Sequence, residues 1–291
     1  MTDGFLNLLK PPGMTSSDAV VLVRRAFPRG TKVGHMGTLD PEAAGVLPIG
    51  VGSAARLFDY VTEKEKTYRA EIAIGAETDT QDATGQVVAR GPAVTEEELS
   101  AVLPRFVGEI EQIPPAYSAI KVGGRKLYEA ARAGETLEVP SRKVTIYGLD
   151  FAGKSGENRF LLDVRCGRGT YIRTLCQDIG RVLGTCSHMA FLLRVQSGIF
   201  GIADAVTPEE FLESAPDAHL LPLDAPLRHL PAVHLSEKLE RVVRNGNPIR
   251  MERWKHPLPE GKIARVYLGQ AFAGMGEAKE GCIRFRCMLL R

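Results

Sequence analysis

Hydrophobic and polar residues along the chain follow patterns that predict its first elements. Residues 5–9 form a short apolar run that a Pro-Pro-Gly triplet interrupts, which predicts a buried strand. Ser17 then precedes valines at helical spacing, so we predict a helix that Ser17 caps and that ends near Phe27. Apolar and polar residues alternate in residues 66–75 and 159–166, and each stretch predicts a half-buried strand.

Two more helices begin with recognisable signals. Thr95 and Glu98 form a capping box for a helix that ends near Val102. Another helix is predicted from about Tyr171 to Leu183, after the second alternating stretch. Because strands and helices follow one another irregularly, we expect an α+β fold in which helices flank a mixed, mainly antiparallel sheet.

The distribution of charge divides the chain into two parts. Residues 214–226 are rich in proline and turn-forming residues, and the sign of the net charge changes there. Residues 226–291 carry 13 Lys/Arg and 6 Asp/Glu, a net charge of +7, whereas the preceding part has a net charge of −5. We therefore predict one domain over residues 1–224 and a second, smaller domain over residues 225–291.

The smaller domain has the composition of a β unit. Residues 264–268 and 282–289 are predicted strands. An excess of positive charge confined to one domain favours contact with nucleic acid.

The composition of the chain mainly excludes classes of protein. The five cysteines include no Cys-x-x-Cys pair and no histidine at zinc-finger spacing, and their odd number argues against a complete disulfide framework. No run of about 18 apolar residues occurs, and the N-terminus does not resemble an export signal. We expect a cytoplasmic protein with no metal site and no contact with a membrane.

The most informative chemistry lies in residues 34–48, which read GHMGTLDPEAAGVLP. Their glycines and prolines predict a shaped loop rather than a regular element, and such loops commonly hold catalytic groups. The loop carries one histidine, His35, and a carboxylate, Asp40. Asp before Pro is also ordinary turn chemistry, so Asp40 needs support from the rest of the chain.

This string resembles the signature loop of the TruB family of tRNA pseudouridine synthases, which reads Gly-His-x-Gly-x-Leu-Asp-Pro and then Gly-x-Leu-Pro. Three downstream blocks follow in the family's order: KTYRA at residues 66–70, QIPPAYSAIK and GRKLY within residues 112–128, and CGRGTYIR at residues 166–173. The resemblance spans residues 4 to about 200. It implies the pseudouridine synthase fold, and the position of residues 225–291 matches the family's PUA-type RNA-binding module.

The resemblance implies the chemistry of the site. Uridine becomes pseudouridine when the N1–C1′ bond breaks, the base rotates, and C5 joins C1′. Asp40 matches the catalytic aspartate, which either adds to C1′ or removes a proton from C2′, and no cofactor is needed. Arg173 matches the arginine that pairs with this aspartate, and an arginine nearby keeps a partly buried carboxylate ionised.

Further positions match residues that bind the target nucleotide, which must leave the base stack to be reached. Tyr68 matches the tyrosine that stacks on the extruded base. The other expected RNA contacts are the pocket residues Tyr171 and Leu192, His35 at the flipped nucleotide or its phosphate, and Lys10 at the RNA backbone. The family usually has two arginines after Leu192, whereas this chain has Leu193 and then Arg194.

The substrate that the resemblance implies is uridine 55 in the T-loop of tRNA, modified by a monomer without an obligate protein partner. A second role as an RNA folding helper is compatible with the same surface. One alternative is a non-catalytic RNA-binding or chaperone protein on this fold, and another is the catalytic subunit of a guide-RNA particle. A glycosidase would need two carboxylates around the bond, and the near neighbour available is Glu42.

Overall fold

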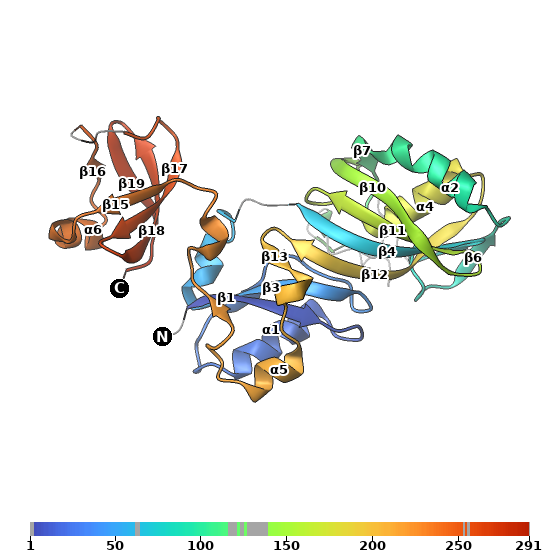
Figure 1. Ribbon diagram of the computed structural model, residues 1–291, viewed down its shortest axis with the longest axis horizontal. Coiled ribbons are helices and arrows are strands. Elements are labelled where there is room, and N and C mark those ends of the chain that lie inside the picture. The colour runs from blue at the N-terminus through green and yellow to red at the C-terminus, as the bar shows by residue number, and fades with distance from the viewer. Residues whose placement is uncertain are drawn as a thin grey trace.

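The computed structural model describes residues 3–61, 65–115, 139–252, 254 and 257–290, together with the backbone of 121–122 and 125–126. In these residues ten strands form one large sheet and five form a second sheet near the C-terminus (Figure 1). The large sheet runs, in spatial order, through β14 (Leu220–Leu221), β1 (Gly4–Lys10), β3 (Ala44–Val51), β12 (Ser187–Ser197), β4 (Lys66–Ile74), β11 (Arg159–Cys166), β10 (Arg142–Gly156) and β7 (Gly108–Gln112).

Short strands complete the sheet structure. The large sheet also includes β2 (Val33–His35), which pairs with β3, and β13 (Phe200–Gly201), which pairs with β12. Two separate hairpins are β5 (Ala76–Thr78) with β6 (Val87–Arg90), and β8 (Lys121–Val122) with β9 (Arg125–Lys126). Within the large sheet β3 and β12 are parallel and the other described pairs are antiparallel, so the predicted mixed, mainly antiparallel sheet is confirmed.

Helices flank the large sheet. The α-helices are α1 (Ser16–Arg25), α2 (Glu96–Val102), α4 (Ile172–Val182), α5 (Pro208–Glu213) and α6 (Glu240–Arg244). The 3₁₀ helices are η1 (Gly52–Leu57), η2 (Leu103–Phe106), η3 (Ile202–Asp204), η4 (Ala225–Leu227) and η5 (Glu237–Leu239). Figure 1 shows α1 and α5 beside β1 and β3, while α2 and α4 lie beside β10 and β11.

Capping decides where α1 begins. The predicted cap, Ser17, is wrong by two residues, because Thr15 caps the helix. The Thr15 hydroxyl accepts the N–H of Asp18 at 3.0 Å, and the Asp18 carboxylate accepts the N–H of Thr15 at 3.1 Å. This reciprocal pair of bonds is a capping box. It satisfies the backbone N–H groups of Thr15 and Asp18, which a cap at Ser17 would leave unpaired. The capping box predicted at Thr95 for α2 is confirmed.

The prediction that residues 34–48 form a loop throughout is wrong at both ends. His35 ends β2, and β3 takes up Ala44 to Val51, so residues 36–43 remain as the loop. Pro48 fits inside β3 because its carbonyl faces Met36, whose N–H donates to it at 2.8 Å. The missing N–H of Pro48 would point to the same side, past the end of β2, so no ladder bond to β1 is lost.

The C-terminal sheet confirms the expected β-rich unit. Its order is β15 (Ala232–Leu235), β17 (Ile263–Leu268), β18 (Ala271–Lys279), β19 (Cys282–Met288) and β16 (Ile249–Arg250). The sheet contacts the N-terminal part of the chain through an apolar cluster. Met275 and Cys287 pack there with Phe5, Leu57 and Phe200, all at most 4% exposed. The two parts therefore share a small core.

Candidate active site

Hydrogen bonds from Lys10 attach the loop of residues 36–43 to the N-terminal segment. Lys10 at the end of β1 is fully buried, and its ammonium donates to the carbonyls of Pro11 at 2.8 Å, Met14 at 2.5 Å and Pro41 at 2.9 Å. Three bonds use all three N–H donors of a lysine. Burial lowers the pKa of Lys10 to about 8, opposed by the nearby charges of Glu42 and Asp40.

The expected contact between Lys10 and the RNA backbone stays a prediction, and the geometry of this structure disfavours it. A side chain with no exposed surface and three carbonyl partners has no free donor for a phosphate. Lys10 instead fixes the backbone on both sides of the Pro-Pro-Gly turn to Pro41, the residue after Asp40. Its role in this structure is to position the loop.

Ser16 provides a second attachment, from the first turn of α1. Its hydroxyl donates to the carbonyl of Leu39 at 3.0 Å and accepts the N–H of Leu39 at 2.9 Å. Both partners are buried, so these bonds are shielded from competing water. The residue before Asp40 is thereby fixed in position, as Pro41 is fixed on the other side.

Arg194 supports the loop from β12 and was not predicted as a site residue. Its side chain is fully buried and donates to the carbonyls of Val46 at 2.7 Å, Gly37 at 3.0 Å and Thr38 at 3.4 Å. A lone arginine in a strand gives no sequence signal for this, because its partners lie about 150 residues earlier in the chain. The parallel pairing of Gly45 with Arg194 brings them together.

Gly45 allows that close approach. A Cβ atom at this position would lie 2.2 Å from the carbonyl oxygen of Arg194, and the φ angle of 115° also favours glycine. The glycine in the signature loop therefore has a packing reason. Any side chain at residue 45 would separate β3 from β12 and move the loop away from its support.

Asp40 pairs with Arg173, as predicted. Arg173 Nε lies 3.0 Å from Asp40 Oδ2, and Arg173 Nη2 donates to Asp40 Oδ1 at 3.3 Å. The arginine side chain is 7% exposed and the aspartate 38%, so the pair is buried on one side and open on the other. Two parallel contacts between a guanidinium and a carboxylate fix both position and orientation.

Arg173 has further partners in the segment after β5. Its Nη1 donates to the carbonyl of Thr80 at 3.2 Å and lies 3.7 Å from Asp82 Oδ2. Asp82 is itself held by the hydroxyls of Thr80 at 2.7 Å and Thr84 at 2.5 Å. Sequence reasoning missed Asp82, although the Asp and Thr residues of segment 78–84 are a turn signal.

A cleft of about 390 Å³ opens at the carboxylate. Its wall includes Asp40, Glu42, Asp82, Phe191 and Leu192. The structure therefore brings Leu192 to Asp40, in agreement with its predicted place. The cleft combines carboxylates with an apolar wall, and that mixture suits an uncharged planar ligand that needs orientation at one edge.

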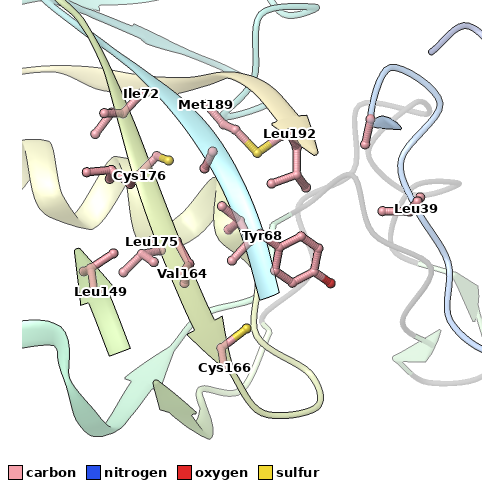
Figure 2. Close-up of a cluster of buried hydrophobic side chains, with 14 of the residues drawn as sticks. Leu39, Tyr68, Ile72, Leu149, Val164, Cys166, Leu175, Cys176, Met189 and Leu192 are labelled. Atoms are coloured by element: carbon pink, nitrogen blue, oxygen red, sulfur yellow. The ribbon is translucent and has the colours of Figure 1, made fainter. Parts of the chain in front are cut away.

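Tyr68 lies in β4 directly opposite Arg194 in the ladder. Figure 2 shows its ring beyond the core of the sheet, pointing toward the segment that carries Leu39. The side chain is 6% exposed and packs in one cluster with Leu39 and Leu192. Burial raises the pKa of Tyr68 and the charge of Arg194 opposes this, so the phenol is protonated near neutral pH.

The remaining predicted residues, Tyr171 and His35, are not among the residues that line the Asp40 cleft in the described part of the chain. Tyr171 caps α4 and is bracketed by Gln112, whose Oε1 accepts its N–H at 3.0 Å and whose Nε2 donates to its carbonyl at 3.2 Å. His35 Nδ1 accepts the N–H of Gly37 at 3.4 Å. Burial and Arg194 lower the pKa of His35, so its ring is neutral near pH 7. His35 lines a second cleft, together with Met36 and Gly37 of the loop.

Part of the sequence block within residues 112–128 lies outside the described residues, namely residues 116–120, 123–124 and 127–128. Within the described ranges, no group of three His, Cys, Asp or Glu side chains is placed to hold a metal ion. Among the helices in those ranges, none has the length and apolar character to cross a membrane.

Two solved structures share this fold over nearly the whole chain. A chain of an H/ACA RNP bound to a substrate RNA containing 2′-deoxyuridine matches with a TM-score of 0.73 and 22% identity, covering 99% of this chain and 85% of that one. A chain of a Cbf5–Nop10–Gar1 complex matches with a TM-score of 0.70 and 25% identity, covering 95% and 78%. The pseudouridine synthase fold is therefore confirmed.

Sequence comparisons agree. The model of the TruB family pseudouridylate synthase N-terminal domain matches residues 24–172, and two TruB C-terminal models match residues 173–228 and 231–288. The tRNA pseudouridine synthase B of Caldanaerobacter subterraneus subsp. tengcongensis is 47% identical over 285 residues, 97% of each chain. That of Alkaliphilus oremlandii is 44% identical over 279 residues, 94% of this chain and 92% of the relative.

These matches define an enzyme of the pseudouridine synthase class, and the chain belongs to its TruB family. The family resemblance expected from the motifs is therefore confirmed. The division between the two domains, predicted at residues 224 and 225, stays a prediction.

Proposed function

We propose that this protein isomerises uridine 55 in the T-loop of tRNA to pseudouridine and that Asp40 is its catalytic carboxylate. The observation that carries the proposal is the Asp40–Arg173 pair at the wall of an open cleft. Relatives at 44% and 47% identity are named tRNA pseudouridine synthase B, which supports tRNA as the substrate.

The proposed mechanism assigns a role to each residue. Bond cleavage at N1 leaves C1′ electron-poor, and the ionised carboxylate of Asp40 acts on the sugar by adding to C1′ or by removing a proton from C2′. Arg173 fixes the orientation of that carboxylate. Leu192 provides apolar surface in the cleft for the extruded base, and Tyr68, packed in one cluster with Leu192, is assigned to stack on that base before C5 joins C1′.

A purely RNA-binding role is less compatible with this site. An ionised carboxylate repels phosphate, and a binding protein gains nothing from holding one in place with a buried arginine. A glycosidase mechanism is also disfavoured. Glu42 and Asp82 line the cleft, but Asp82 is engaged by Thr80, Thr84 and Arg173 and so is not free to act as a second acid.

The C-terminal sheet is proposed to bind RNA as well. Residues 226–291 carry a net charge of +7, and phosphate contacts position RNA without contributing to bond-making. Location in the cytoplasm and a monomeric state stay part of the proposal.

The direct test is incubation of purified protein with an unmodified tRNA transcript, without added cofactor. Carbodiimide-dependent stops in reverse transcription then map pseudouridine along the tRNA. A stop at uridine 55 that requires enzyme supports the proposal. Modification at another uridine would overturn the assigned position, and no modification of any tRNA would overturn the substrate.

A further inference from the structure

Residues of the loop 36–43 line two clefts. Asp40, Glu42 and Ala43 line the first, and Met36 and Gly37 line a second cleft of about 300 Å³. The second cleft is lined by residues that include His35, Gly37, Phe58, Lys66, Arg168 and Phe200. It therefore combines basic side chains with aromatic and aliphatic surface, directly beside the catalytic loop.

Lys66 is the central polar group of this second cleft. It is the first residue of β4 and shares a face of that strand with Tyr68, two residues further on. Its Nζ would lie 3.3 Å from a Cβ atom built on Gly37, so the ammonium reaches the loop itself. In the described part of the chain, the ammonium of Lys66 has neither a hydrogen bond nor an ion pair.

Positive charge dominates around Lys66. Arg168 is exposed and lines the same cleft, and Arg194 lies behind Gly37. Asp59 is the carboxylate that lines the cleft among the residues described there. Burial, with Arg194 and Arg168, lowers the pKa of Lys66 to about 8, while burial raises the pKa of Cys166 to about 11. The thiol and the neutral His35 ring therefore offer no compensating charge near pH 7.

We propose that Lys66 and Arg168 form an anion subsite that binds a phosphodiester group of the substrate RNA next to the flipped uridine. A partly buried ammonium without a partner is unfavourable in the free protein, and a phosphate oxygen supplies the charge and the acceptor that it lacks. Arg168 at the rim adds a second donor group. The identity of the RNA in this inference rests on the proposed function. The binding test of the subsite does not require the protein to be active.

The shape of the second cleft agrees with a nucleotide ligand. Phe58 and Phe200 form apolar wall beside the two cations, which is suited to a ribose or base attached to the phosphate. Residues of the loop line both clefts, so one RNA strand that passes along the loop would meet both. Lys66 would thus register the strand while Asp40 acts on the flipped nucleotide.

The test compares Lys66→Met with a matched control, Lys154→Met. Lys154 lies opposite Phe160, close to the start of β11, whereas Lys66 lies opposite Cys166, the last residue of β11. The two lysines therefore lie at opposite ends of this strand. Each variant removes one positive charge. Binding of an RNA hairpin with a tRNA T-stem and loop is measured at several salt concentrations. We expect Lys66→Met to bind roughly fivefold more weakly, with a salt slope shallower by about 0.7–0.9, and Lys154→Met to match the parent.

Lys66→Arg separates charge from folding and adds a pH readout. The guanidinium stays charged at all pH values used, whereas Lys66 loses its proton near pH 8 in the free protein. Between pH 7 and 9 the parent should therefore lose RNA affinity more steeply than Lys66→Arg. Lys10, whose pKa is also about 8, is present in both proteins and cancels in the comparison. Equal pH profiles would overturn the subsite.

A neutral methylphosphonate placed at single positions in the hairpin identifies the phosphate. At one position the methylphosphonate should weaken binding of the hairpin by the parent and leave binding by Lys66→Met unchanged. If no position behaves in this way, the subsite is overturned. Pseudouridine formation by the parent is measured in parallel. If the parent is active but Lys66→Met binds like Lys154→Met, the subsite is wrong and the function stands. If the parent is inactive but the Lys66-dependent position persists, the function is wrong and the subsite stands.

Discussion

The ammonium of Lys10 lies 2.9 Å from the carbonyl oxygen of Pro41, the residue that follows Asp40. This contact connects the end of β1 to the loop of residues 36–43 across 31 positions of sequence. Arg194 holds the preceding part of the loop in the same way, through the carbonyls of Gly37 and Thr38. Two buried cations thus fix the backbone on both sides of a carboxylate that is itself partly open.

Asp40→Asn should abolish pseudouridine formation while leaving tRNA affinity within about threefold of the parent. The amide keeps the size of the carboxylate and loses the charge that acts on the sugar. Glu42→Gln, in the wall of the same cleft, is the matched control and should retain activity. Turnover is measured by pseudouridine mapping and affinity by filter binding. Appreciable turnover by Asp40→Asn would remove Asp40 from the mechanism.

Arg173→Lys should slow the single-turnover reaction by about tenfold or more, equivalent to roughly 1.4 kcal/mol of activation free energy. Lysine cannot reproduce the two parallel contacts of Arg173 with Asp40, so the carboxylate loses its fixed orientation. The control is Arg181→Lys, on the same helix but 58% exposed. Rates are measured with enzyme in saturating excess over tRNA. Equal rates for the two variants would show that orientation by Arg173 is unimportant.

Tyr68→Phe should bind tRNA about as well as the parent, whereas Tyr68→Leu should bind more weakly by about 1–3 kcal/mol, because leucine lacks a stacking face. The ring is 6% exposed, so Tyr68→Leu also changes packing and thermal unfolding must be recorded beside affinity. If the two variants lose affinity equally while remaining folded, Tyr68 does not act by stacking.

The pH dependence of stability should reveal Lys66 without any RNA. Its folded-state pKa is about 8, below the ordinary 10.5, so between these values the unfolded chain binds a proton that the folded protein does not. The contribution of Lys66 to the free energy of unfolding therefore rises with pH between these two pKa values. The free energy of unfolding of the parent should rise relative to Lys66→Met from about pH 8 to 10.5, as measured in urea. A difference independent of pH would contradict the lowered pKa.

Met275→Ala should destabilise the protein by about 2–5 kcal/mol, the usual range for truncating a buried methionine. Met275 is fully buried in the cluster that joins the C-terminal sheet to Phe5 and Leu57. Leu212→Ala serves as the control, because Leu212 is 59% exposed. Urea unfolding followed by tryptophan fluorescence and circular dichroism gives both values. Equal stabilities would show that the two parts do not share a core.

The sequence alone determined the features that depend on neighbours in the chain. Alternation over residues 66–75 and the Thr95–Glu98 capping box specified β4 and α2, because strand pleating and helix capping are local. The resemblance of residues 34–48 to the TruB signature loop marked Asp40 as the candidate catalytic aspartate and matched Arg173 to its partner, and the structure shows the two side chains paired at 3.0 Å.

Only the tertiary structure decided the environment of the long polar side chains. Lys10 was expected at the RNA surface, yet the fold buries it against three carbonyls. Arg194 became a support of the loop because β3 and β12 pair in parallel, with Gly45 allowing the contact. Whether a lysine or arginine meets solvent, backbone or RNA depends on strands that are distant in sequence and adjacent in space, and local residue patterns do not encode that adjacency.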